Sequence, residues 1–94
     1  MMIRSFDDAE TARFFMTGKS RRLPGKILKR AAMRLEQLNA ATAVTDLYLP
    51  PSNRLEALKG SGKGQYSVRI NDQWRLCFRF TGSDAFEVEI IDYH

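Results

Sequence analysis

The sequence has little of the chemistry that usually identifies a small protein: one cysteine, one histidine and no long apolar run. A single cysteine, Cys77, excludes an intramolecular disulfide and is typical of proteins in a reducing compartment. Cys77 and His94 cannot supply the four ligands of a structural zinc site, so we expect neither a bound metal nor another cofactor. Residues 1–8 contain two acids and no apolar signal-peptide core, which predicts a cytoplasmic protein without a membrane span.

Acidic residues are missing from Thr11 to Leu35, where eight lysines and arginines occur. Beyond Leu35 the balance reverses, with six basic against eight acidic residues. The net charge of +4 is therefore concentrated in the N-terminal third of the chain. Such an asymmetry indicates that the protein binds a polyanion or an acidic protein partner.

The length of 94 residues predicts one domain, 1–94, with a modest core. Ser5 followed by Asp8 resembles a capping box and predicts a helix that runs to about Met16. Gly18 is then the expected end of this helix, because glycine readily adopts the left-handed conformation found there.

A second, longer helix is predicted from Pro24 to about Asn39, because proline suits the first turn of a helix. Its expected apolar side comprises Ile27, Leu28, Ala31, Ala32, Leu35 and Leu38. Its expected basic side comprises Lys26, Lys29, Arg30 and Arg34, with Met33 among them. Basic helix sides are usually only solvated, but an exposed methionine favours a docking surface, since methionine adapts to varied partners.

The C-terminal third alternates apolar and polar residues with the period of two that predicts half-buried strands. A loop of odd length after Ile70 keeps both apolar sets in one core and pairs Arg69 with Arg75. A second loop, 81–85, then pairs Phe80 with Phe86, Arg79 with Glu87 and Arg75 with Ile91. With an N-terminal edge strand and a short, bulged strand at 54–59, these elements predict an α+β fold. An N-terminal strand and two helices pack on one face of a mainly antiparallel sheet of four to five strands.

The two arginines on the polar face of the central strand have different expected neighbours. Arg79 lies opposite a carboxylate and should form an ordinary surface ion pair. Arg75 lies between Arg69 and an isoleucine, and like charges directly opposite each other are destabilising. This face of the sheet is therefore the expected position of a bound polyanion.

A set of reactive side chains gathers around Arg75 in the predicted sheet. Arg69, Arg75 and Tyr93 share one face, Lys59 lies on the adjoining strand, and Asp92 and His94 follow the last strand. Cations, a phenol, a carboxylate and an imidazole suffice for cleaving RNA by attack of its own 2′-hydroxyl, without a metal. Asp92 also shares the parity of Val88 and Ile90, so a structural role inside the sheet is the alternative for this residue.

Three stretches of the chain, 50–60, 66–78 and 88–94, resemble the HigB family. These are the host-inhibition-of-growth, or plasmid-maintenance killer, toxins of the RelE/ParE superfamily. The most specific features are Asn71-Asp72-Gln73-Trp74-Arg75 and the terminal Asp92-Tyr93-His94. The opening Ile3-Arg4-Ser5-Phe6 is similar as well, so the resemblance covers nearly the whole chain.

The resemblance implies the toxin of a type II toxin–antitoxin system. It implies a ribosome-dependent endoribonuclease that cuts mRNA in the ribosomal A site and so inhibits translation and growth. The implied partners are the 70S ribosome with its 16S rRNA, the mRNA, and a HigA-like helix-turn-helix antitoxin. Operator DNA is implied as a partner only through that antitoxin.

The resemblance also implies roles for individual residues. Arg75 stabilises the transition state and Lys59 holds a phosphate. Asp92 and His94 share proton transfer, and Tyr93 orients the nucleotide or stacks on it. Some family members have a histidine at the position of Glu56, which leaves Glu56 open as an alternative base. The expected RNA-binding residues are Arg69, Lys63, Glu56, Lys26, Lys29 and Arg30.

Two other functions compete with this interpretation. A ParE-like poison of DNA gyrase needs no acid–base set, whereas the last three residues of this chain provide one. An RNA-binding module should stack bases on aromatic side chains of its polar sheet face, but Tyr66, Phe78 and Phe80 have the parity of the core. The sequence therefore favours the endoribonuclease, with the gyrase poison as the alternative.

Overall fold

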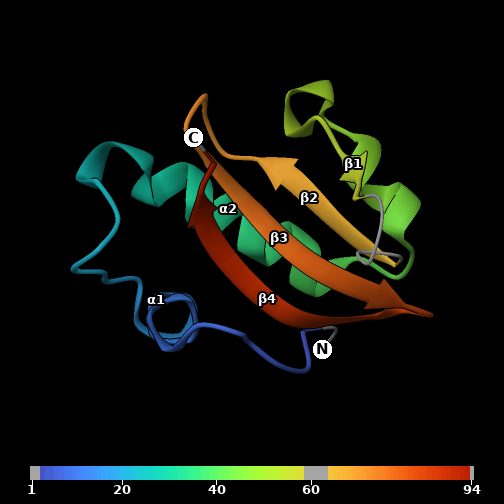
Figure 1. Cartoon of the computed structure of the whole chain (residues 1–94), viewed down its shortest axis with the longest axis horizontal. Coiled ribbons are helices and arrows are strands. Elements are labelled where there is room, and N and C mark those ends of the chain that lie inside the picture. The colour runs from blue at the N-terminus through green and yellow to red at the C-terminus, as the bar shows by residue number, and fades with distance from the viewer. Residues whose placement is uncertain (1–2, 59–63, 94) are drawn as a thin grey trace.

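The computed structural model of the protein describes residues 3–58 and 64–93. In chain order its helices are α1 (Ala9–Thr17), the 3₁₀ helix η1 (Gly25–Ile27), α2 (Leu28–Ala40), and two further 3₁₀ helices, η2 (Val44–Tyr48) and η3 (Pro51–Asn53). The strands that follow are β1 (Glu56–Ala57), β2 (Gln65–Arg69), β3 (Trp74–Thr81) and β4 (Asp84–Asp92). They form one antiparallel sheet in the order β1-β2-β3-β4. The helix α2 crosses one face of this sheet and α1 lies beside β4 (Figure 1), which confirms the predicted α+β fold.

The N-terminal segment and α1 are joined to the free edge of β4. The backbone N–H of Arg4 donates to the carbonyl of Ala85 at 2.7 Å, and that of Val88 donates to the carbonyl of Ser5 at 3.1 Å. Ser5 is therefore used by the sheet, and the predicted capping box is wrong. Asp8 is the N-cap of α1 instead, because its carboxylate accepts from the backbone N–H of Glu10. The helix ends at Gly18, as predicted, with a left-handed φ of 75°.

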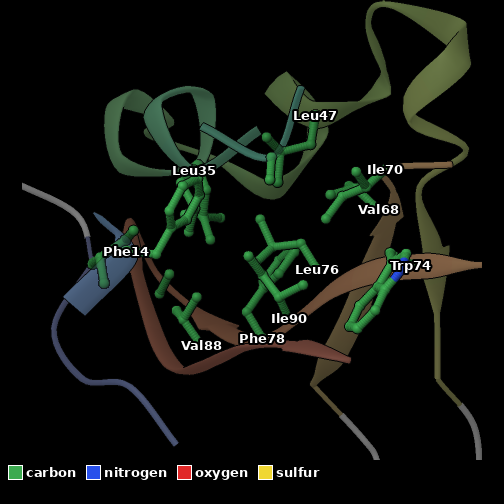
Figure 2. Close-up of a cluster of buried hydrophobic side chains, with 14 of the residues drawn as sticks. Phe14, Leu35, Leu47, Val68, Ile70, Trp74, Leu76, Phe78, Val88 and Ile90 are labelled. Carbon is green, nitrogen blue, oxygen red and sulfur yellow. The ribbon is translucent and has the colours of Figure 1, made fainter. Parts of the chain in front are cut away.

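The core lies between the helices and one face of the sheet (Figure 2). The helix α2 contributes Leu35 and α1 contributes Phe14, while Leu76 and Val88 reach them from the strands. Trp74 is also buried. None of the helices within the described residues is long and apolar enough to cross a membrane.

The register between β2 and β3 is the predicted one, with Val68 opposite Leu76 and Arg69 opposite Arg75. The predicted register between β3 and β4 holds only near the end of the chain, where Arg75 lies opposite Ile91. Further along, the pairing shifts by one residue, so that Phe80 lies opposite Ala85 rather than Phe86.

A β-bulge in β4 causes this shift. Glu87 has a positive φ of 55°, and its backbone N–H donates to the hydroxyl of Ser5 at 2.9 Å. One extra residue in a strand reverses the alternation beyond it, so Ala85 faces the core and Phe86 is only half-buried. The ion pair of Arg79 with Glu87 still forms, at 3.4 Å.

Candidate active site

Arg75 stands at the centre of the polar sheet face and is far more constrained than the sequence predicted. Its residue exposure is only 8%. Its Nε donates to the hydroxyl of Ser67 at 2.9 Å, and its Nη2 donates to the carbonyl of Arg54 at 2.7 Å. The sequence predicted only Arg69 and Ile91 as neighbours of Arg75 and no acceptor for its guanidinium, and this prediction is wrong. A side chain buried to this degree needs hydrogen bonds for its donors. These bonds fix the direction of the guanidinium.

Glu56 and Arg69 both lie on the β2 side of this arginine and were both expected to contact RNA. Glu56 comes from β1, and its Oε1 lies 3.5 Å from Nη2 of Arg75. The Glu56 side chain is 60% exposed, so its carboxylate lies both at the guanidinium and in contact with solvent. Arg69 is the cross-strand neighbour of Arg75, but its guanidinium turns away to an ion pair with Asp72.

The end of β4 lies beside the turn between β2 and β3 (Figure 1). The ring of Tyr93 lies under the Arg75 guanidinium, with 5.6 Å from the guanidinium carbon to the ring centroid. Tyr93 is 44% exposed, so part of its ring remains free for another contact. Asp92 is exposed rather than directed into the core, so this carboxylate has no structural role inside the sheet.

Gln73 holds the end of β4 in this position, and the sequence interpretation overlooked it. Its amide Nε2 donates to Oδ2 of Asp92 at 3.0 Å, and its carbonyl accepts from the backbone N–H of Tyr93 at 2.6 Å. The signal for such a role was its position, one residue before the strand that carries Arg75. The predicted site residues Lys59, Lys63 and His94 lie outside the described residues.

The predicted helix from Pro24 forms as η1 followed by α2, and its basic side is only partly as predicted. Lys26, Lys29 and Arg30 are exposed and line an open groove of about 540 Å³ together with Met33. Arg34 is not part of it, because only 5% of this residue is exposed and its Nε donates to the carbonyl of Arg69 at 2.9 Å. Burial, followed by the nearby charges of Arg30 and Arg69, lowers the pKa of Arg34. This arginine ties α2 to the sheet and is not available to a partner.

The polar face also carries the single cysteine, and its environment makes it unreactive. Burial, together with the Glu89 carboxylate, raises the pKa of the Cys77 thiol to about 11, with a smaller opposing effect of Arg75. A raised pKa keeps the thiol protonated at neutral pH, and only the thiolate is a good nucleophile. Cys77 is therefore a buried structural residue of β3 and not a nucleophile.

We expect iodoacetamide at pH 8 to alkylate Cys77 roughly a hundredfold more slowly in the folded protein than in the chain unfolded in urea. The expectation follows from the smaller thiolate fraction of a thiol with a raised pKa. Mass spectrometry of timed samples provides the measurement. Equal rates in the folded and unfolded chain would contradict the buried position of the thiol.

The arrangement provides the parts of a phosphate-cleaving site. A fixed guanidinium can stabilise charge that develops on a phosphorane, because it needs no reorganisation during the reaction. The Glu56 carboxylate lies at this guanidinium, the Asp92 carboxylate lies at the end of β4, and such groups can transfer protons. The exposed ring of Tyr93 beside them offers a surface on which a base can stack.

Comparison with known proteins gives consistent matches over nearly the whole chain. Residues 4–94 match the family of HigB-like toxins, described as the RelE-like toxin of the type II toxin–antitoxin system HigB. The chain is 41% identical to Toxin HigB-1 of Vibrio cholerae, over 89% of this chain and 90% of that protein. It is 30% identical to Endoribonuclease HigB of Proteus vulgaris, over 99% of this chain and 100% of that protein. Among solved structures, the YoeB dimer of Staphylococcus aureus has a similar fold, with a TM-score of 0.58 and 20% identity over 100% of this chain and 97% of that one.

Proposed function

The chain belongs to the HigB-like toxins, the RelE-like toxins of type II toxin–antitoxin systems, and from this premise we propose that it cleaves mRNA in the ribosomal A site. It is an endoribonuclease that inhibits translation and growth. The observation that supports the proposal most directly is Arg75, a guanidinium fixed by two hydrogen bonds at the centre of the polar sheet face. We further propose that the chain acts as one domain in the cytoplasm and uses no metal or other cofactor.

The proposed reaction is an attack of the RNA on itself. A base on the protein removes the proton of a 2′-hydroxyl, and the resulting oxygen attacks the adjacent phosphorus. The bond to the 5′-oxygen breaks, and an acid on the protein returns a proton to this leaving oxygen. The products are a 2′,3′-cyclic phosphate and a 5′-hydroxyl. Arg75 stabilises the additional negative charge on the phosphorane between these two steps.

In this proposal, carboxylates and the imidazole of His94 transfer the protons. Asp92, held by Gln73, shares it with His94, and Lys59 adds a phosphate contact. Glu56 is the alternative base, because its carboxylate lies 3.5 Å from the Arg75 guanidinium. The Glu56 assignment places a base next to the cation that the reaction requires.

The proposed partners are nucleic acid on the ribosome and a protein that neutralises the toxin. A HigA-like helix-turn-helix antitoxin would bind the toxin and connect it to operator DNA. The ribosome would offer 16S rRNA phosphates to the basic groove of Lys26, Lys29 and Arg30, because contacts with phosphates dominate the affinity of proteins for nucleic acids.

Reversing the charge of these three residues, as Lys26→Glu, Lys29→Glu and Arg30→Glu together, is expected to weaken ribosome association at low salt at least tenfold. The dependence of log Kd on log salt should become shallower by about 2–3, since each of the three lost phosphate contacts removes about 0.7–0.9 of a unit. Sedimentation with 70S ribosomes at several salt concentrations measures both effects. The matched control reverses three other exposed basic residues, Arg4, Arg13 and Lys19. Intact ribosome binding with lost antitoxin binding would assign the groove to the antitoxin instead.

The experiment that tests the proposed function maps the 5′ ends of a translated message after induction of the protein. The same message is incubated with purified protein, with and without ribosomes. New 5′ ends that appear only with translating ribosomes are the expected result. Intact mRNA together with inhibition of gyrase supercoiling would favour the ParE-like alternative and overturn the proposal.

A further inference from the structure

A row of three arginines begins with Arg54, just before β1, and continues with Arg69 and Arg75 on the polar face of the sheet. Only one of them is accounted for by the reaction. Arg54 stands two residues before Glu56, which β1 pairs with Ser67, and it has a left-handed φ of 44°. β2 then pairs Arg69 with Arg75. Arg54 lies next to Arg75, because the carbonyl of Arg54 accepts from Nη2 of Arg75 at 2.7 Å.

Two exposed carboxylates accompany this row. Glu56 lies at Arg75, as described above, and Asp72 forms an ion pair with Arg69. The Asp72 side chain is 99% exposed, whereas that of Arg69 is only 25% exposed. The Arg69 side chain is therefore held against the sheet, whereas the Asp72 carboxylate can move from Arg69 into solvent.

The charge of Arg54 also acts on the Asp72 carboxylate. The hydrogen bond and charge of Arg69, and to a smaller extent the charge of Arg54, lower the pKa of the Asp72 carboxyl. The carboxylate thus marks a position where two guanidinium groups favour a negatively charged oxygen. Arginine binds carboxylate and phosphate oxygens with the same planar set of donors.

The turn itself does not depend on Asp72. Its geometry is held by Asn71, whose Oδ1 accepts from the backbone N–H groups of Gln73 and Trp74, both at 2.8 Å. The backbone N–H of Ile70 closes the turn by donating to the carbonyl of Trp74 at 2.9 Å. The ion pair is therefore additional to the structure of the turn, and its removal should leave the fold unchanged.

We propose that Arg54 and Arg69 form a second phosphate subsite beside Arg75, which the Asp72 carboxylate occupies in the free protein. The subsite takes the RNA backbone phosphate adjacent to the one that is cleaved, and Asp72 moves away when this phosphate binds. The inference rests on the proposed function for the identity of its ligand. Exchange of one anion for another also explains why a strongly basic row can exist in the free toxin: each internal carboxylate offsets the repulsion between its arginines.

The test measures binding of a short single-stranded RNA whose 2′-hydroxyls are methylated, so that it cannot be cleaved. Asp72→Asn is expected to bind this RNA about two- to fivefold more tightly than the wild type, because an exposed ion pair no longer has to be broken. The slope of log Kd against log salt should steepen by up to about 0.7, the value of one phosphate contact on a single strand. Arg54→Gln should weaken binding and make the slope shallower.

Two controls separate the subsite from a general effect of charge. Glu36→Gln removes an exposed acid from α2 and should leave the affinity unchanged. In an Arg69→Ala background, Asp72→Asn should lose most of its effect, because the cycle isolates the coupling between the two residues.

Tighter binding by Asp72→Asn that persists in the Arg69→Ala background would overturn the proposal. So would wild-type affinity and slope in Asp72→Asn, including the case in which neither protein binds. Binding as expected without any cleavage on ribosomes would refute the proposed function and still support the subsite.

Discussion

Replacing Arg75 by alanine is expected to lower the rate of mRNA cleavage at least a hundredfold. Removal of one preorganised group that stabilises charge in a transition state costs on the order of 3 kcal/mol of activation free energy. The variant should also be less stable than the wild type, because the hydroxyl of Ser67 and the carbonyl of Arg54 lose their donor. A hydrogen bond to a charged group contributes about 2 kcal/mol, which corresponds to a fall in Tm of roughly 10 °C in a domain of this size.

Single-turnover cleavage on programmed ribosomes, well below both melting temperatures, separates the two effects. Arg75→Lys is the second variant, since it keeps the charge but loses the planar donors, and we expect an intermediate rate. Arg79→Ala is the matched control on the same strand, where the partly exposed pair with Glu87 contributes about 0–1 kcal/mol. Equal losses of cleavage in Arg75→Ala and Arg79→Ala would exclude Arg75 as the catalytic cation.

The sequence predicted the register of β2 and β3 because both strands alternate without interruption and the loop length is limited to odd values. It could not predict the register of β3 and β4 in the same way. The pattern of Phe86, Val88 and Ile90 is regular, yet a bulge at Glu87 reverses the alternation between them. This bulge is held by Ser5, more than eighty residues away, and contacts of this kind leave no local pattern.

The same limit applies to the site. Alternation identified Arg75 as the unusual arginine, but its main acceptor is the carbonyl of Arg54, and main-chain groups have no signature in a sequence. The helical pattern likewise placed Arg34 with the solvated residues, although a carbonyl of β2 draws it inward. Side chains could therefore be assigned to faces from the sequence, whereas their hydrogen-bond partners required the fold.

Tyr93→Ala is expected to lower cleavage about ten- to a hundredfold, while Tyr93→Phe stays within about threefold of the wild type. The ring lies 5.6 Å from the Arg75 guanidinium and leaves enough surface exposed to stack on a nucleotide base. Stacking of a base on an aromatic ring contributes about 1–3 kcal/mol, and the contact with the cation adds about 0.5–1 kcal/mol. Both contributions come from the ring and are kept by phenylalanine.

The measurement is again single-turnover cleavage on programmed ribosomes, now at saturating and subsaturating toxin. Loss of the stack should affect the half-saturating concentration, and loss of the contact with Arg75 should affect the maximal rate. Tyr48→Ala is the control, because this tyrosine of η2 is also exposed but lies outside the set of residues around Arg75. An equal loss in Tyr93→Phe and Tyr93→Ala would mean that the hydroxyl takes part in proton transfer. The acid–base set would then consist of Tyr93 with a carboxylate, and the ring would serve only to place the phenol beside the Arg75 guanidinium.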